Sequence, residues 1–541
     1  MNRQLLHFLL VFGCILLFSQ CAKRGTPSGG PKDSIPPVII KSNPENYSTL
    51  YEGDEIRIYF DEYIKLKDLQ SNLIVSPPFT NQPVITPLST SKVLKIQIQD
   101  TLKENTTYSF NFGKSIVDNN EDNSFDYYKY VFSTGDFIDS LTVEGTIKDA
   151  LLLKSKDPVT VMLYERNEAF TDSIVYLEKP TYITTTRDST YAYKLTNIKE
   201  GNFLLVALQE SVNDYIFQPK TDKIGFIEGV VSTPTDSSFQ IKMFKEVLEY
   251  RMARPNYPSK QRIIFGYEGN VDSLKLTPLF DLPEGYEYKT YWESATDTLN
   301  YFFKPPFEFE TTTDTLQFLA QNREQLDTLT VVMKDLYLDT LKISKVSPGT
   351  VIPRDSIKLK GNNPLVALDT EKITVMDKDS MQIPVTTYID ERYNVASLIF
   401  EKQVDQLYSV QILPEAFTDF YGNKSLDTLA YNFRTQTEAD YGTITFTLQN
   451  AKKFPIIVEL VDSKYKLIRS NYITSAEDAP SFFDFLEPDN YYIRIIYDEN
   501  ENGSWDTGNY LMKVQPEEVA YYPKPIEVRA NWSLPETFIL D

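Results

Sequence analysis

Ile56-Arg57-Ile58-Tyr59-Phe60 places an apolar side chain at every second position, with an arginine and a tyrosine between them. The same alternation recurs at residues 93–98 and 108–112. A period of two over short runs is typical of β-strands with one buried face. Together with the Pro36-Pro37 dipeptide, which marks an entry point, these runs predict a β-sandwich over residues 35–136.

Similar runs continue to the end of the chain, and part of the pattern repeats. Residues 108–134 align with 408–435, and the next strand, 141–147, aligns with 442–448. A duplicated pair of modules favours rigid domains in a row. The predicted fold is all-β, a tandem array of about five β-sandwich domains after a signal peptide and a tether. The expected boundaries are 1–20 for the signal peptide, 21–34 for the tether, and 35–136, 137–240, 241–344, 345–437 and 438–541 for the domains.

Length, composition and charge are consistent with this architecture. A chain of 541 residues is too long for one core, so several domains are expected. Aromatic residues make up 13%, with 36 Tyr and 33 Phe, which is typical of β-rich proteins. The formal net charge of −22 does not favour binding to phosphate backbones, so we expect no nucleic-acid partner.

The few cysteine and histidine residues exclude several chemistries. The 2 Cys are Cys14 and Cys21, and the 1 His is His7. The chain after residue 21 therefore has no thiol, no disulfide and no imidazole. Ser-His-Asp and Cys-His catalysis are excluded there, as is zinc bound by His or Cys. We predict no enzyme activity and no required cofactor.

The N-terminus predicts export and lipid attachment. Arg3 precedes an apolar run, Leu5 to Phe18, that is too short for a transmembrane helix and fits a secretory signal. The run ends in Ser19-Gln20-Cys21, which resembles a bacterial lipobox, in which the cysteine becomes a lipid-bearing first residue with palmitate-type acyl chains. Gly and Pro between residues 25 and 31 predict a mobile tether. The alternatives are lipidation at Cys14, or an ordinary signal peptide with Cys21 incidental.

Two stretches carry a family resemblance. Cys21 to Pro37, with the following hundred residues, resembles Bacteroidota lipoproteins that carry an S-layer-type Ig-like domain, including an Ile-x-Ile-x-Phe-x-Glu strand at 56–62. Residues 139–208 resemble transthyretin-like, carboxypeptidase-regulatory sandwiches. The resemblance implies a lipid anchor in the outer membrane. The basic Lys23-Arg24 pair favours the periplasmic face over the cell surface, and orientation stays open.

Residues 498–506 have the spacing of a calcium loop. Asp498, Asn500, Asn502 and Asp506 supply oxygen ligands at positions 1, 3, 5 and 9, with Gly503 at position 6. These ligand types suit a hard cation such as Ca²⁺. The twelfth position, where an EF-hand needs Glu, is Asn, and the preceding residues read as a strand rather than a helix. A polar hairpin with Asx turns is the alternative.

Asp followed by Ser or Thr and then Ile, Leu or Met occurs twelve times. Typical residue frequencies give about two or three such tripeptides. The tripeptide resembles the O-glycosylation acceptor of exported Bacteroidota proteins, and bulky glycans would shield an acidic rod. The alternative is turn chemistry at strand entries. The candidate acceptors are Ser34, Thr101, Ser140, Ser173, Ser273, Thr298, Thr315, Thr328, Thr340, Ser356, Ser380 and Thr428.

These observations lead to one expected function and two alternatives. We expect a non-enzymatic, lipid-anchored scaffold or binding protein at the outer membrane. The resemblance implies an accessory subunit of an assembly or secretion complex, with envelope proteins as partners. The first alternative is a carbohydrate-binding or adhesion lipoprotein. The second is a carboxylate-dependent hydrolase, for which Asp61-Glu62 is a poor pair because strand neighbours point to opposite faces.

Overall fold

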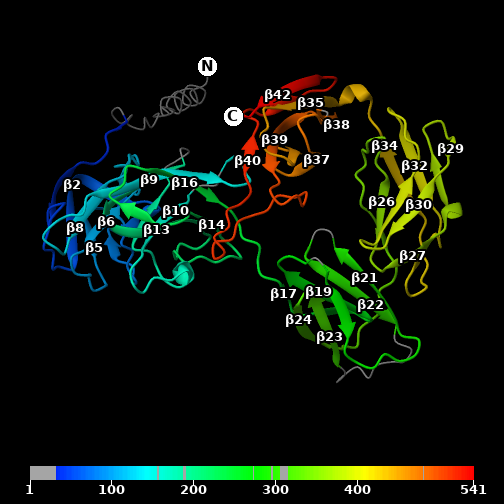
Figure 1. The fold of residues 1–541 in the computed structure, drawn as a ribbon, viewed down its shortest axis with the longest axis horizontal. Helices are drawn as coiled ribbons and strands as arrows, with labels where there is room; N and C mark the ends of the chain where they lie inside the picture. Colours follow the sequence, from blue (N-terminus) through cyan, green and yellow to red (C-terminus); the bar gives the residue numbers. More distant parts are fainter. Residues whose placement is uncertain are drawn as a thin grey trace, which may run out of the picture.

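The computed structural model describes residues 32–154, 158–186, 191–271, 273–293, 296–304, 315–478 and 480–540. The signal peptide and Cys21 lie outside the described residues. The regular secondary structure of the described part is almost entirely β-strand, arranged as successive sandwich domains (Figure 1). Five separate hydrophobic cores define domains 1 to 5. None of the described helices has the length and apolar character needed to cross a membrane.

Domain 1 packs a sheet of order β1-β2-β5-β4, with β7 beside β2, against a sheet of order β3-β6-β8. The alternation in β2 buries Ile56, Ile58 and Phe60 against Phe110 and Phe132. The elements are β1 (Ile39–Asn43), β2 (Glu55–Leu66), α2 (Leu69–Asn72), β3 (Ile74–Ser76), β4 (Val84–Thr86), β5 (Ser91–Gln97), β6 (Thr107–Asn111), β7 (Ile116–Asp118) and β8 (Lys129–Ser133).

Domain 2 has a sheet of order β11-β10-β13-β14, with β15 beside β13, and a sheet of order β12-β9-β16. The β9–β16 pair is parallel and so close at Gly145 that a Cβ there would lie 1.8 Å from the Phe239 carbonyl oxygen. The elements are β9 (Leu141–Asp149), β10 (Thr160–Glu165), η1 (Asp172–Tyr176), β11 (Tyr182–Thr185), β12 (Ala192–Ile198), β13 (Gly201–Gln209), β14 (Lys223–Phe226), β15 (Val231–Thr233) and β16 (Ser238–Met243).

Domain 3, whose type the sequence left unassigned, is also a sandwich. Its sheets have the orders β17-β19-β22-β21, with β18 beside β19, and β20-β23-β24. The strands are β17 (Arg251–Met252), β18 (Asn256–Ser259), β19 (Arg262–Glu268), β20 (Lys275–Pro278), β21 (Glu287–Glu293), β22 (Thr298–Lys304), β23 (Thr315–Asn322) and β24 (Gln325–Val332).

Domain 4 has the strand order of domain 1. Its sheet β25-β26-β31-β30 corresponds to β1-β2-β5-β4, and β27 pairs with β33 as β2 pairs with β7. The sheet β29-β28-β32-β34 corresponds to β3-β6-β8 with β29 added beside β28. The elements are β25 (Ile343–Lys345), β26 (Ile357–Gly361), β27 (Leu365–Leu368), η2 (Thr370–Lys372), β28 (Ile373–Met376), β29 (Gln382–Ile383), β30 (Thr386–Asp390), β31 (Val395–Ile399), β32 (Leu407–Ile412), β33 (Phe417–Asp419) and β34 (Leu429–Arg434).

Domain 5 has the strand order of domain 2, including a parallel pair, β35–β42, in the place of β9–β16. Its elements are η3 (Glu438–Asp440), β35 (Gly442–Gln449), β36 (Ile456–Val461), β37 (Leu467–Ile473), β38 (Ser481–Leu486), β39 (Asp489–Tyr497), β40 (Val519–Tyr521), β41 (Ile526–Val528) and β42 (Ser533–Ile539).

Domains 2 to 5 are arranged in a closed ring, because domain 5 returns to contact domain 2 (Figure 1). An ion pair of 2.6 Å between Lys220 and Glu268 joins domains 2 and 3. One of 2.7 Å between Arg354 and Asp484 joins domains 4 and 5. The long loop between β39 and β40 buries Tyr510 in domain 2, and this loop is the centre of the candidate site.

Candidate functional site

The docking loop, residues 498–518, leaves domain 5 after β39 and reaches across to domain 2. Its Tyr510 side chain is fully buried in the apolar cluster on the outer face of the domain 2 sheet. The Tyr510 ring meets the ring of Phe226 edge-on at 5.4 Å and lies 6.3 Å from the ring of Tyr176. A buried aromatic anchor in a pocket of aromatic residues is the arrangement that dominates stable interfaces.

Polar contacts surround this anchor on both sides. The backbone N–H of Tyr510 donates to Glu246 Oε1 at 2.5 Å, and the Thr507 hydroxyl donates to the Lys245 carbonyl at 2.8 Å. Lys513 pairs with Asp172 at 2.7 Å. Burial raises the pKa of the Glu246 carboxyl, and the hydrogen bond from Tyr510 opposes that rise. The docking loop is therefore hydrogen-bonded as well as packed onto domain 2.

A second contact between the same two domains centres on the Leu151 carbonyl. This oxygen accepts hydrogen bonds from the Tyr521 hydroxyl at 2.7 Å and from Arg494 Nη1 at 3.5 Å. Arg494 also pairs with Glu459 at 2.5 Å, and both side chains are largely buried. Lys148 donates to the Val519 carbonyl at 3.2 Å. A buried ion pair satisfied in this way fixes the orientation of the groups around it.

The candidate calcium residues lie at the base of the docking loop. Amide nitrogens of Asn500 and Asn502 each lie 2.6 Å from Asp506 Oδ2. Asp498 accepts from the backbone N–H groups of Asn502 at 3.0 Å and Gly503 at 2.8 Å. The four predicted ligands are thus brought together, with the amide nitrogens rather than the amide oxygens facing the Asp506 carboxylate.

Glu517 completes this loop base, and sequence reasoning missed it. Its Oε1 accepts from the Glu499 N–H at 2.8 Å and its Oε2 from the Asp506 N–H at 3.0 Å. Burial raises the pKa of Glu517, with further contributions from the nearby Asp506 and Asp498 carboxylates. No group of three or more His, Cys, Asp or Glu side chains is placed to hold a metal among the described residues. The loop base uses amides in place of some carboxylates, and calcium there stays a prediction.

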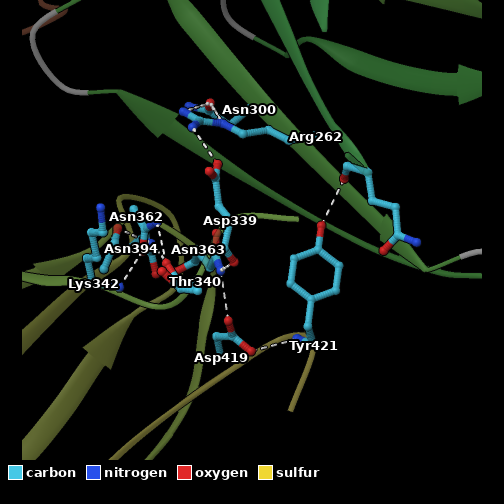
Figure 2. A network of polar contacts seen from close by, with 12 residues as sticks. Arg262, Asn300, Asp339, Thr340, Lys342, Asn362, Asn363, Asn394, Asp419 and Tyr421 are labelled. Carbon is cyan, nitrogen blue, oxygen red and sulfur yellow. Dashed lines mark hydrogen bonds and ion pairs between the residues drawn. The ribbon is translucent and has the colours of Figure 1, made fainter. Parts of the chain in front are cut away.

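A second joint of the ring connects domains 3 and 4 (Figure 2). Arg262 of β19 donates to Asn300 at 3.0 Å and lies 3.9 Å from the Asp339 carboxylate. The Tyr421 hydroxyl donates to the Gln261 carbonyl at 2.8 Å. Around these polar groups, Tyr291 and Phe302 pack on residues of domain 4. This joint combines an aromatic cluster with hydrogen bonds, as the joint between domains 2 and 5 does.

The twelve candidate glycan acceptors all keep some exposure in the described structure. Nine side chains are exposed, and Ser173, Thr298 and Ser356 are partly buried. The apolar residue that follows is buried at Leu299, Leu316, Leu329 and Ile357. These placements are compatible with modification and with turn chemistry at strand entries, so both interpretations stay open.

Residues 33–134 match the model of the bacterial Ig-like domain. Domain 1 is a bacterial Ig-like domain. A comparison with curated proteins found no match.

Three solved structures give low-scoring overlaps with this chain. Native E. coli alpha-2-macroglobulin is 8% identical, with 86% of this chain and 41% of that chain covered and a TM-score of 0.14. The eight N-terminal Ig domains of Down Syndrome Cell Adhesion Molecule are 8% identical, with 94% and 61% covered and a TM-score of 0.14. The BSP domain of a biofilm-associated protein is 8% identical, with 94% and 99% covered and a TM-score of 0.14. Overlaps at this level say nothing about function.

Proposed function

We propose that this protein is a non-enzymatic, lipid-anchored scaffold at the outer membrane of a Bacteroidota cell, and an accessory subunit of a protein assembly or secretion complex. The observation that carries the proposal is the docking of domain 5 onto domain 2 through Tyr510. A ring of domains closed by a buried contact holds its loops and sheet edges in a fixed arrangement. Preorganised surfaces of this kind bind partners without losing much conformational entropy.

The N-terminal sequence supports the location. Cys21 would carry the acyl chains after removal of residues 1–20, and residues 21–34 would tether the ring to the membrane. Domains 2 and 5 would be the transthyretin-like modules of the array, domain 4 a second Ig-like domain, and calcium would stiffen the loop base at Asp498. Glycans at the exposed Asp-Ser/Thr acceptors would shield the surfaces that partners do not use.

The test is recovery of partners from native membranes with the full-length protein. Wild type should stay membrane-bound and bring down the same envelope proteins in each preparation. Cys21→Ser should be released from the membrane, whereas Cys14→Ser should stay bound. Equal membrane retention of the Cys21→Ser variant would contradict the anchor. Recovery of no envelope protein by the anchored wild type would contradict the scaffold.

The second candidate is a carbohydrate-binding or adhesion lipoprotein. One observation favours it, a polar cavity between domains 1 and 2 whose walls carry hydroxyl and amide side chains. Retention of glycans rather than of membrane proteins by the purified chain would favour this candidate over the scaffold.

A further inference from the structure

A cavity of about 420 Å³ lies where domain 1 meets domain 2. Domain 1 contributes α2, β6 and β8 to its walls, and domain 2 contributes β11 and β12. Most of the lining side chains carry a hydroxyl or amide group, among them Asn72, Ser109, Asn111, Thr184 and Thr196. A cavity of this size can enclose a small polar ligand.

Direct contacts hold the two walls of the cavity together. The backbone N–H of Ile183 in β11 donates to the Ser76 hydroxyl in β3 at 3.1 Å. Lys179 donates to the Phe79 carbonyl at 2.8 Å. The edge strands of the two domains therefore meet beside the cavity, and the site exists before any ligand arrives.

Lys129 brings a positive charge into this cavity. Its ammonium donates to Asn197 Oδ1 at 2.7 Å and contacts the Thr196 hydroxyl, which are both neutral groups. Within the described chain, Lys129 has no carboxylate partner, and the described lining residues include no acid. The other β-strand lysine of the lining, Lys194, pairs with Glu144 at 2.9 Å. Burial alone lowers the pKa of Lys129 to about 8, because no counter-charge opposes it.

A partly buried ammonium without a counter-ion carries a desolvation cost, and an anion that enters the cavity would offset that cost. In a chain of net charge −22, a lining with three lysines and no acid differs in sign from the chain as a whole. The lining has no arginine, and of its three lysines only Lys129 is partly buried, whereas Lys114 and Lys194 are exposed. This ammonium matches a carboxylate better than a phosphate, because phosphate sites combine forked arginines, several converging cations or helix N-termini. The many hydroxyl and amide groups match the hydroxyls of a sugar, and Tyr127 adds an aromatic surface to the lining.

The geometry points to a binding site for an acidic sugar, with the sugar carboxylate on the Lys129 ammonium and the sugar hydroxyls on the Ser, Thr and Asn side chains around it. This inference deepens the second candidate function and is independent of the ring. Its failure would leave the scaffold proposal untouched, because that proposal is tested by partner recovery and membrane retention.

The experiment titrates the full-length protein calorimetrically with galacturonate, with galactose as the uncharged control and inorganic phosphate as the competing anion. Galacturonate should bind, and galactose and phosphate should bind at least about tenfold more weakly. Titration with trigalacturonate shows whether the natural ligand is a polysaccharide or a free monosaccharide. Tighter binding of the trimer than of galacturonate indicates a polysaccharide, and equal binding indicates a free monosaccharide.

The Lys129→Gln variant should lose at least about tenfold in galacturonate affinity. The matched control is Lys402→Gln, which removes a buried lysine in domain 4 whose pKa is also lowered by burial. Thermal unfolding of both variants checks that they fold. Unchanged galacturonate affinity in a folded Lys129→Gln variant would overturn the inference.

The wild-type protein supplies a test that needs no variant. An anion beside Lys129 would raise the pKa of its ammonium from about 8, so binding at pH 8.5 should take up protons. Proton uptake is measured by titration in buffers of different ionisation enthalpy, and affinity should fall as the pH rises further. Galactose or phosphate binding as tightly as galacturonate, or no galacturonate binding at all, would also overturn the inference.

Discussion

Domains 2 and 5 share one strand order, but the connection between β13 and β14 differs from its counterpart between β39 and β40. In domain 2, residues 210–222 link β13 to β14, and Glu210 accepts hydrogen bonds from the N–H groups of Asp214 and Tyr215 within the same loop. In domain 5, the equivalent connection is the docking loop, residues 498–518, which leaves its own domain and buries Tyr510 in domain 2. The comparison teaches that lengthening one loop of a repeated sandwich can turn a local turn into a joint between domains.

The largest effect is expected from removal of the aromatic anchor. Tyr510→Ala should cost about 3–5 kcal/mol in the free energy that holds domain 5 on domain 2, because it leaves a cavity among Phe226, Phe244 and Tyr176. Limited proteolysis should then cleave the docking loop faster than in wild type. The control is Tyr337→Ala, since that side chain is 94% exposed. Equal cleavage rates for wild type and Tyr510→Ala would show that the loop is not anchored.

A smaller effect is expected at the hydrogen bond beside the anchor. Glu246→Ala leaves the Tyr510 N–H without its acceptor and should cost about 1–3 kcal/mol by chemical denaturation. Glu246→Gln keeps an acceptor oxygen and should cost less. The exposed Glu249→Ala is the matched control from the same segment. A ranking in which Glu249→Ala costs most would contradict the role of Glu246.

Addition of calcium tests whether the docking loop of domain 5 differs from residues 210–222 of domain 2 in cation binding as well as in length. If Ca²⁺ occupies the loop base, a tenfold excess over its dissociation constant should stabilise domain 5 by about 1.4 kcal/mol, and chelation should reverse the gain. Asp506→Asn should abolish this response, whereas Glu499→Ala, a change at an exposed neighbour, should keep it. An unchanged melting curve with millimolar Ca²⁺ would support the Asx-turn hairpin instead.

The remaining comparison concerns pH and the shorter loop. Burial raises the pKa of Glu210 to about 7, so the folded state binds a proton that the unfolded chain has lost. The stability of domain 2 should therefore fall as the pH rises from about 4.3, the usual value for Glu, to about 7. Glu210→Gln should flatten this slope, and the exposed Glu228→Gln should not. Parallel slopes for wild type and Glu210→Gln between those pH values would rule out this assignment.

Much of the fold could be predicted from the sequence because alternation is a local signal. Ile56, Ile58 and Phe60 are buried in β2 as their spacing predicts, and the all-β class of the chain is confirmed. The four candidate calcium residues also cluster, because they lie within nine positions of each other in one loop. Lipidation at Cys21 lies outside the described residues and stays a prediction.

The joints between domains could not be predicted in this way. Tyr510 and Glu246 are 264 positions apart, and nothing in the local pattern around either residue pairs them. The available signal in the sequence was Tyr510, an aromatic residue in a long polar loop. This signal predicts a buried anchor but does not predict which domain the anchor packs against. Lys129 is a similar case, because its strand position was predictable but its cavity requires two domains to meet.

The most direct test of the closed ring is the distance between domains 2 and 5 in solution. Spin labels at Val230→Cys in domain 2 and Ile539→Cys in domain 5, both exposed positions, can be placed in a Cys21→Ser background with residues 1–20 removed. We predict one narrow distance distribution in this protein and a broad one when Tyr510→Ala is added. A broad distribution with Tyr510 intact would contradict the ring.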